Sequence, residues 1–208
     1  MLVPVTTGVE REPCGPQGHP RSEALIAEIV REFPSFRIAP KRGDALQRAI
    51  DVGLRVVTLG GMRTYLTRYH TVLFGVLWVP DTWSGMGDLD RYVLLRHERV
   101  HLRQRRRMGD LLMGFVYLVP FFPLGLAYGR ARIEWEAYEE TLLATAEVHG
   151  LAEAYALKGW LFARFRGPDY GFMWPFRGSL ERWFAASMAR VEREIGPRTG
   201  EDAPADTR

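Results

Sequence analysis

Residues 88–108 read DLDRYVLLRHERVHLRQRRRM, with two aspartates at the start, three arginines at the end and Gly109 immediately after. Acidic residues near a helix N-terminus and basic residues near its C-terminus interact favourably with the helix dipole, and glycine is a common stop. We therefore predict one long helix from about Asp88 to Met108. On this helix His97 and His101 lie about 40° apart around the axis and about 6 Å apart along it, so both imidazoles can reach one metal ion.

The predicted helix has two distinct faces. One face carries the histidines with residues that suit a protein interior, and the opposite face carries arginines. The first set is Leu94, His97, His101, Gln104 and Met108, and the second is Arg96, Arg99, Arg103 and Arg106. We expect the histidines to point inward and the arginines to lie on a solvated face. Glu98 stands about 100° from His97, where its carboxylate can accept a proton from a metal-bound water, so we assign it as the general base.

A catalytic zinc site needs a third protein ligand and leaves the fourth position to water. The predicted helix downstream, from about Arg130 to His149, carries five glutamates. Four of them share one face and suggest a solvated acidic stripe: Glu136, Glu139, Glu140 and Glu147. Glu134 lies on the other side of the helical wheel and points into the fold. We therefore predict that Glu134 is the third ligand and that the metal is Zn²⁺.

Two short motifs, HERVH over residues 97–101 and EWEA over residues 134–137, together resemble the gluzincin metallopeptidases. The likeness is to the CAAX prenyl protease type, with its Glu-x-x-Ala-Asp second motif. The resemblance implies a zincin-like minimal domain that binds zinc through His97, His101 and Glu134 and uses Glu98 as its base. Tyr138 stands where the second motif has aspartate, and a phenol supports a metal-ligating histidine less strongly than a carboxylate does.

The predicted reaction is hydrolysis of peptide bonds by a zinc metalloendopeptidase, with a peptide or protein as substrate. Zinc would lower the pKa of its water and polarise the carbonyl group, while Glu98 takes the water's proton. Three side chains are candidates for stabilising the negative charge on the carbonyl oxygen: Tyr138, Tyr170 and Arg132. Because an extended substrate can pair with a sheet edge, we expect the strand over Thr67–Val79 to offer one.

The remaining sequence predicts an α+β fold that is mostly helical. Amphipathic patterns predict further helices over Ser22–Phe33, Ala45–Val52, Leu151–Arg166 and Leu180–Ile195. Ser22 is the expected N-cap of the first. β-Branched and aromatic residues predict a small sheet or hairpin over residues 54–80, before the active-site helix. The 208 residues, 47% hydrophobic, suit a single domain over 21–195 between a flexible leader, 1–20, and a disordered tail, 196–208.

Two observations bear on location. The single cysteine, Cys14, cannot form an internal disulfide, which favours a cytoplasmic protein. Residues 111–128 carry no charge, but Pro120 and Pro123 divide them into a helix of about nine residues and a turn. Such a helix is too short to span a bilayer, so we expect a buried hydrophobic hairpin, with membrane association through residues 111–128 as the alternative.

Other interpretations of the chain stay open at this stage. A nucleic-acid-associated protein is suggested by basic and aromatic residues: Arg103, Arg105, Arg106, Arg107 and Trp174. A net charge of +3 is too small to argue for a nucleic-acid partner, and arginines in a last helical turn already complement the dipole. A further interpretation is a non-catalytic zinc-binding scaffold, docked on a membrane through residues 111–128.

Overall fold

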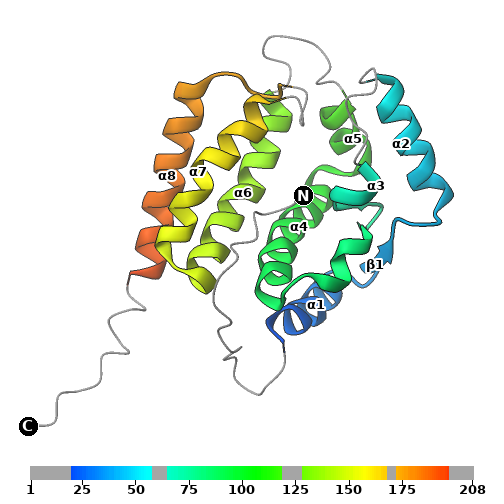
Figure 1. Cartoon of the computed structure of the whole chain (residues 1–208), viewed down its shortest axis with the longest axis horizontal. Helices are drawn as coiled ribbons and strands as arrows, with labels where there is room; N and C mark the ends of the chain where they lie inside the picture. The colour runs from blue at the N-terminus through cyan, green and yellow to red at the C-terminus, as the bar shows by residue number, and fades with distance from the viewer. Residues whose placement is uncertain (1–19, 58–64, 119–127, 168–171, 197–208) are drawn as a thin grey trace, which may run out of the picture. The chain divides into compact units, whose positions relative to one another are not determined.

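The computed structural model describes residues 20–57, 65–118, 128–167 and 172–196. The chain divides into two compact units, residues 1–118 and 119–208. Within them the described elements are mostly helices, with one three-stranded sheet, which confirms the predicted α+β class (Figure 1). The predicted single domain over 21–195 stays a prediction. Residues 1–19 and 197–208, which hold nearly all of the predicted leader and tail, lie outside the described residues.

The first unit contains five α-helices, three short strands and one 3₁₀ helix among its described residues. In chain order they are α1 (Arg21–Glu32), β1 (Arg37–Pro40), α2 (Ala45–Val57), α3 (Tyr65–Arg68), β2 (Thr71–Leu73), β3 (Val76–Val79), η1 (Asp81–Gly85), α4 (Asp88–Met108) and α5 (Asp110–Leu118). The strand order is β1-β3-β2, with β1 parallel and β2 antiparallel to β3. Phe74 (φ 51°) and Gly75 (φ 78°) form the tight turn between β2 and β3, which needs positive φ at both positions.

The structure corrects several sequence expectations in this unit. Ser22 is not the N-cap of α1 but lies inside it, where its backbone N (3.0 Å) and its hydroxyl (2.6 Å) both donate to Asp88 Oδ1. Ser22 therefore ties α1 to the first turn of α4. The small sheet or hairpin expected over 54–80 is confirmed in its second part, where β2 and β3 pair as an antiparallel hairpin, but α2 runs on to Val57 and α3 precedes β2. β1 was not predicted as a strand at all.

We expected a single strand over Thr67–Val79 whose edge could pair with a substrate, and this expectation is also wrong. This stretch contains the end of α3, then β2, then β3, and β3 is the middle strand of the sheet. A middle strand has both sides occupied by its neighbours, so it cannot accept an added strand. Within the described part of this stretch, only β2 lies at an edge of the sheet.

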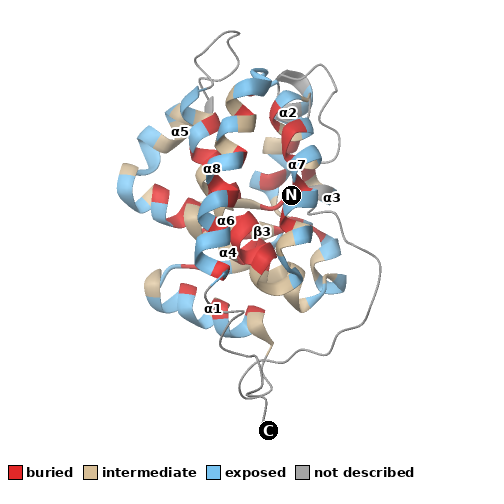
Figure 2. Cartoon of the chain, turned by 90° about the vertical axis from the view of Figure 1, so that its left-hand side faces the viewer, coloured by how far each residue is buried: buried red, intermediate tan, exposed pale blue. Residues whose placement is uncertain are grey.

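The core of the first unit forms where α1 and the sheet meet α4. Figure 2 shows buried residues on β3 and on one side of α4. One cluster of buried apolar residues joins these elements: Leu25, Ile29, Phe36, Leu77, Val79, Leu95 and Leu102. Burial of a large aliphatic side chain contributes roughly 1.5–3 kcal/mol, so this cluster fixes the position of α4 against the sheet.

The arginine face of α4 is not simply solvated, as the sequence suggested, because α1 meets it with a carboxylate. Glu32 accepts hydrogen bonds from Arg103 Nε (2.8 Å) and Arg99 Nε (2.8 Å), and Arg106 Nη2 lies 3.4 Å from it. The hydrogen bond from Arg103, with that from Arg99, lowers the pKa of Glu32 from 4.5 to about 2 against the opposing effect of burial. The arginine face therefore has a structural partner in α1.

We predict that Glu32→Gln lowers the free energy of unfolding by about 1 kcal/mol at pH 7, since several arginines lose one shared countercharge. The folded-state pKa of about 2 lies below the ordinary 4.5, so this stabilisation is present above about pH 4.5 and is lost as the pH falls towards 2. Urea unfolding at pH 7 and pH 3 measures both effects. Glu23→Gln, an exposed change on α1, is the control. An equal loss in the two variants at pH 7 would contradict the prediction.

The second unit contains three helices among its described residues, α6 (Tyr128–His149), α7 (Leu151–Arg166) and α8 (Arg177–Ile195). Figure 1 shows them side by side, and the span of α7 confirms its prediction. Trp135 of α6 is fully buried and stacks edge-on against Phe165 of α7 at 5.4 Å. Its indole N–H donates to Ser187 Oγ of α8 at 3.2 Å. One side chain of α6 thus contacts both other helices and fixes the rotation of α6 about its own axis.

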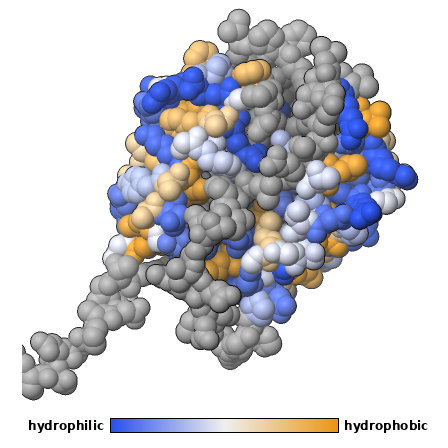
Figure 3. Space-filling view, viewed as in Figure 1, coloured by the Kyte–Doolittle hydropathy of each residue, from blue (hydrophilic) through white to orange (hydrophobic). Residues whose placement is uncertain are grey.

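The predicted hydrophobic hairpin is described only in its first half. α5 has nine residues, as expected from the position of the prolines, and residues 119–127 lie outside the described part. Leu111, Leu112 and Phe115 of α5 are exposed, so the helical half of the hairpin is not buried as expected. On the face seen in Figure 3, hydrophobic residues form several separate patches among hydrophilic ones. None of the described helices has the length and apolar character needed to cross a membrane.

Candidate metal centre

α4 brings two imidazoles together in the first unit. The helix spans Asp88–Met108 as predicted, and His97 and His101 are 2% and 7% exposed, which confirms that they point inward. Their Nε2 atoms lie 3.1 Å apart, within hydrogen-bonding distance of each other. The two Nε2 atoms therefore point at each other. A single cation placed between them could be bound by both rings.

Gln104, one turn further along α4, holds the second imidazole. His101 Nδ1 lies 2.9 Å from Gln104 Oε1, and an amide oxygen can only accept, so Nδ1 carries the proton and donates it. Nε2 of His101 is then left with a lone pair, which is the form that binds a metal. The sequence placed Gln104 on the correct face but did not indicate this role, because its orienting contact depends on the side-chain rotamer.

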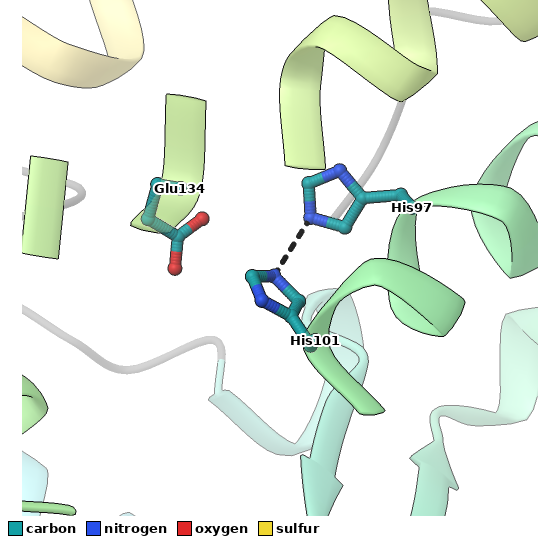
Figure 4. Close-up of side chains that lie close together, drawn as sticks. All are labelled: His97, His101 and Glu134. Carbon is teal, nitrogen blue, oxygen red and sulfur yellow. Dashed lines mark hydrogen bonds between the residues drawn. The ribbon is translucent and has the colours of Figure 1, made fainter. Parts of the chain in front are cut away.

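Glu134 of α6 completes the cluster. It is 5% exposed, in agreement with the inward position that the helical wheel predicted. One ligand atom from each of His97, His101 and Glu134 lies within 4.8 Å of the other two, and all three residues are buried. Figure 4 shows the Glu134 carboxylate turned toward the two imidazole rings. Among the described residues, these three form a group that could hold a metal ion.

The donor set suits a transition-metal ion, and zinc is one of the metals that two histidines and a carboxylate can bind. Two nitrogens bound tetrahedrally at about 2.0–2.1 Å from one zinc ion lie about 3.3 Å from each other. The observed separation of 3.1 Å is close to that value, so the imidazoles need little movement to share an ion. Two histidines and one carboxylate also form a common catalytic zinc set, which keeps a fourth position for water.

Glu98, the assigned base, follows the first histidine on α4 and is 4% exposed. A carboxylate at this depth is costly unless charged or hydrogen-bonding groups lie near it. The negative charge of Glu98 raises the pKa of Lys41, opposing the effect of burial, so a buried cation lies within electrostatic reach of Glu98. No sequence pattern pointed to Lys41.

The three candidates for oxyanion stabilisation have different surroundings. The Tyr138 ring is fully buried and stacks edge-on against Trp160 (5.8 Å) and Phe165 (5.7 Å) in the second unit. The Arg132 guanidinium is centred 5.0 Å from the Trp183 ring. Tyr170 lies outside the described residues. Each role in catalysis therefore stays a prediction.

The acidic stripe of α6 is less solvated than predicted. Its four glutamates are half-buried, and Glu139 accepts a hydrogen bond from Ser187 Oγ at 2.9 Å, with Arg190 Nη1 3.7 Å away. They do not belong to the candidate cluster, whose members are the two histidines and Glu134. The wheel therefore distinguished Glu134 correctly, although its neighbours partly pack on the protein.

The residues behind the nucleic-acid hypothesis have intramolecular contacts. Arg103 and Arg106 meet Glu32, and Arg105 pairs with the Asp110 carboxylate, with Nη2 2.8 Å from Oδ2. Trp174 stacks on Trp183 at 5.9 Å. These contacts give Arg103, Arg105, Arg106 and Trp174 partners within the protein, and the nucleic-acid hypothesis stays a prediction.

No protein family, curated protein or solved structure matches the chain. Fold and site together define a mostly helical α+β protein with a buried cluster of two histidines and one glutamate that could hold a metal ion. Because one fold can host many functions, the function is argued from the chemistry of that cluster.

Proposed function

We propose that the chain is a zinc-dependent metallopeptidase with a zincin-like active-site helix, α4. The observation that carries the proposal is the buried group of His97, His101 and Glu134, whose ligand atoms lie within 4.8 Å of one another. The position of Glu98, next to a ligand on the same helix, adds a base to the metal set. Two buried histidines that only stabilise a helix would have no need of a carboxylate from another helix beside them.

The roles of the residues follow from their positions. His97, His101 and Glu134 would hold the ion, and Gln104 keeps His101 in its metal-binding tautomer through the bond to Nδ1. Zinc, when bound, supplies an acidic water and a Lewis acid for the substrate carbonyl. Glu98 accepts the proton of the attacking water and delivers it to the nitrogen of the leaving amine, which leaves the two peptide fragments as products.

Removal and return of the metal test this function. Hydrolysis of a quenched fluorescent peptide library should stop when a chelator strips the protein, and it should return on addition of one equivalent of Zn²⁺. Chelation should also lower the melting temperature, because an ion that binds only the folded state stabilises it. Hydrolysis that continues unchanged in the stripped protein would contradict the proposal. One bound zinc without cleavage of any library member would favour the scaffold hypothesis instead.

A further inference from the structure

α5, which follows the end of α4, carries large apolar side chains on its outer face (Figure 1). Leu111 is 92% exposed, Phe115 63% and Leu112 52%. At about 100° per residue, these three side chains lie within an arc of roughly 100° on one face of the helix. Single exposed apolar residues are common on protein surfaces, but several together on one helix face mark an interaction surface.

A fourth exposed apolar side chain, Phe74, lies at the tip of the β2–β3 hairpin and is 65% exposed. Arg105 connects this tip to α5. Its guanidinium carbon lies 6.0 Å from the centroid of the Phe74 ring, and its Nη2 donates to Asp110 Oδ2 at 2.8 Å, at the first residue of α5. The hairpin tip and the helix therefore belong to one surface. We call it the α5 surface, and its apolar residues are Phe74, Leu111, Leu112 and Phe115.

Phe74 is poorly suited to the turn that it occupies. Its φ is 51° and that of Gly75 is 78°, and a hairpin turn with positive φ at both central positions favours the sequence Asn-Gly. A bulky residue at positive φ is strained, and a side chain that lies mostly in solvent offsets little of that cost by packing. A residue that conflicts with its own backbone and gains little from folding is expected where a partner uses it.

The charges beside the α5 surface identify the class of partner. Residues 103–110 read RQRRRMGD, with four arginines and one acid. Arg103, Arg106 and Arg107 are exposed, although Glu32 meets the first two. Apolar side chains that project beside arginines match the interface of a bilayer with anionic lipids, where acyl chains surround the apolar groups and phosphates meet the guanidinium groups. A second copy of the chain would bring the same arginines against each other, and like charges repel.

We propose that the α5 surface docks the protein on an anionic lipid bilayer, with α5 lying in the plane of the interface and the Phe74 ring inserted beside it. A helix of nine residues is about 13 Å long, so it lies along the headgroup region rather than across the membrane. The proposal gives the membrane association that the sequence left open a defined surface, which includes Phe74 outside residues 111–128. It makes no use of the metal centre and is independent of the proposed function.

Flotation of the full chain with lipid vesicles tests the docking. The wild type should float with vesicles of phosphatidylcholine and phosphatidylglycerol, and much less with phosphatidylcholine alone. The double variant Leu111→Ser, Phe115→Ser should lower the partition coefficient about 10- to 100-fold, because two apolar side chains no longer enter the lipid. The control Val30→Ser, Tyr155→Ser changes residues that are 41% and 46% exposed on other helices and should bind like the wild type. Absence of binding by the wild type, or equal partition of the two double variants, would overturn the proposal.

Phe74→Asn separates docking from folding. The change creates the Asn-Gly turn that the backbone favours, so the melting temperature should stay constant or rise. The partition coefficient should nevertheless fall by about threefold to tenfold, because the inserted ring is lost. A variant with wild-type partition would contradict the insertion of Phe74.

The arginines and the competing occupant are tested with the same vesicles and by sedimentation. Arg106→Gln, Arg107→Gln should weaken binding to the mixed vesicles about tenfold and leave binding to phosphatidylcholine unchanged, since only the anionic headgroups attract the guanidinium groups. Higher salt should weaken wild-type binding in the same way. Without vesicles, the wild type should sediment as a monomer. A dimer that Leu111→Ser, Phe115→Ser dissociates would overturn the proposal and show that the α5 surface joins two copies of the chain.

Discussion

Replacing His97 and His101 together by alanine is expected to remove the bound zinc. The two residues supply two of the three donors in the cluster. Zinc sites bind with roughly 10–16 kcal/mol, or about 3 kcal/mol for each ligand, so loss of both should weaken binding on the order of ten-thousandfold. Metal analysis of the purified proteins should give about one zinc per chain in the wild type and none in the double variant. Zinc should then raise the melting temperature of the wild type alone.

Matched variants separate loss of the site from general damage. His149→Ala removes an exposed imidazole at the end of α6 and should leave the zinc content unchanged. Glu134→Ala should lose much of its zinc affinity, whereas Glu136→Ala and Glu140→Ala, which alter half-buried residues of the same helix, should bind zinc normally. Equal zinc content in the wild type and the double-histidine variant would remove the basis of the metal centre. Zinc bound by Glu136 or Glu140 would show that Glu134 is not the third ligand, but the two histidines would remain ligands.

The parts of the site that the sequence predicted are those that depend on a single helix. The ends of α4 follow from its own charges and from Gly109, so its span from Asp88 to Met108 was confirmed. The inward position of His97 and His101 depends only on helical phase, and so does the burial of Glu134. Local periodicity therefore located all three candidate ligands, although the two helices are far apart in the sequence.

The parts that the sequence did not predict depend on contacts between distant segments. β1 consists of Arg37–Pro40, with no alternation of polar and apolar residues, and it becomes a strand only by pairing with β3. Ser22 looked like a helix cap because serine often is one, but its hydroxyl instead binds Asp88. No sequence pattern singled out Lys41, and its buried ammonium is held by Tyr65 and Thr71 on other elements. Tertiary contacts outweigh local preference at each of these positions.

The second prediction with a large expected effect concerns the base. Glu98→Gln should keep one zinc per chain and lower kcat by about 10²- to 10⁴-fold, the usual contribution of a general base. Glutamine has nearly the shape of glutamate but cannot take the proton of water at neutral pH, nor pass it to the leaving amine. The steady-state rate on the best substrate of the peptide library measures the loss, beside zinc content and the far-UV circular dichroism spectrum.

A third variant shows whether a loss of rate in Glu98→Gln comes from the base or from the buried charge. Glu98 is 4% exposed, and its negative charge and that of Asp51 both raise the pKa of Lys41 against burial, so the amide also removes one of the charges that favour the Lys41 ammonium. The combined variant Glu98→Gln, Lys41→Met removes both charges and should recover stability, since no unpaired buried ion remains. It should not recover hydrolysis, because the proton acceptor is still missing. A combined variant that regains the wild-type rate, or a Glu98→Gln protein that turns over normally, would show that Glu98 is not the base.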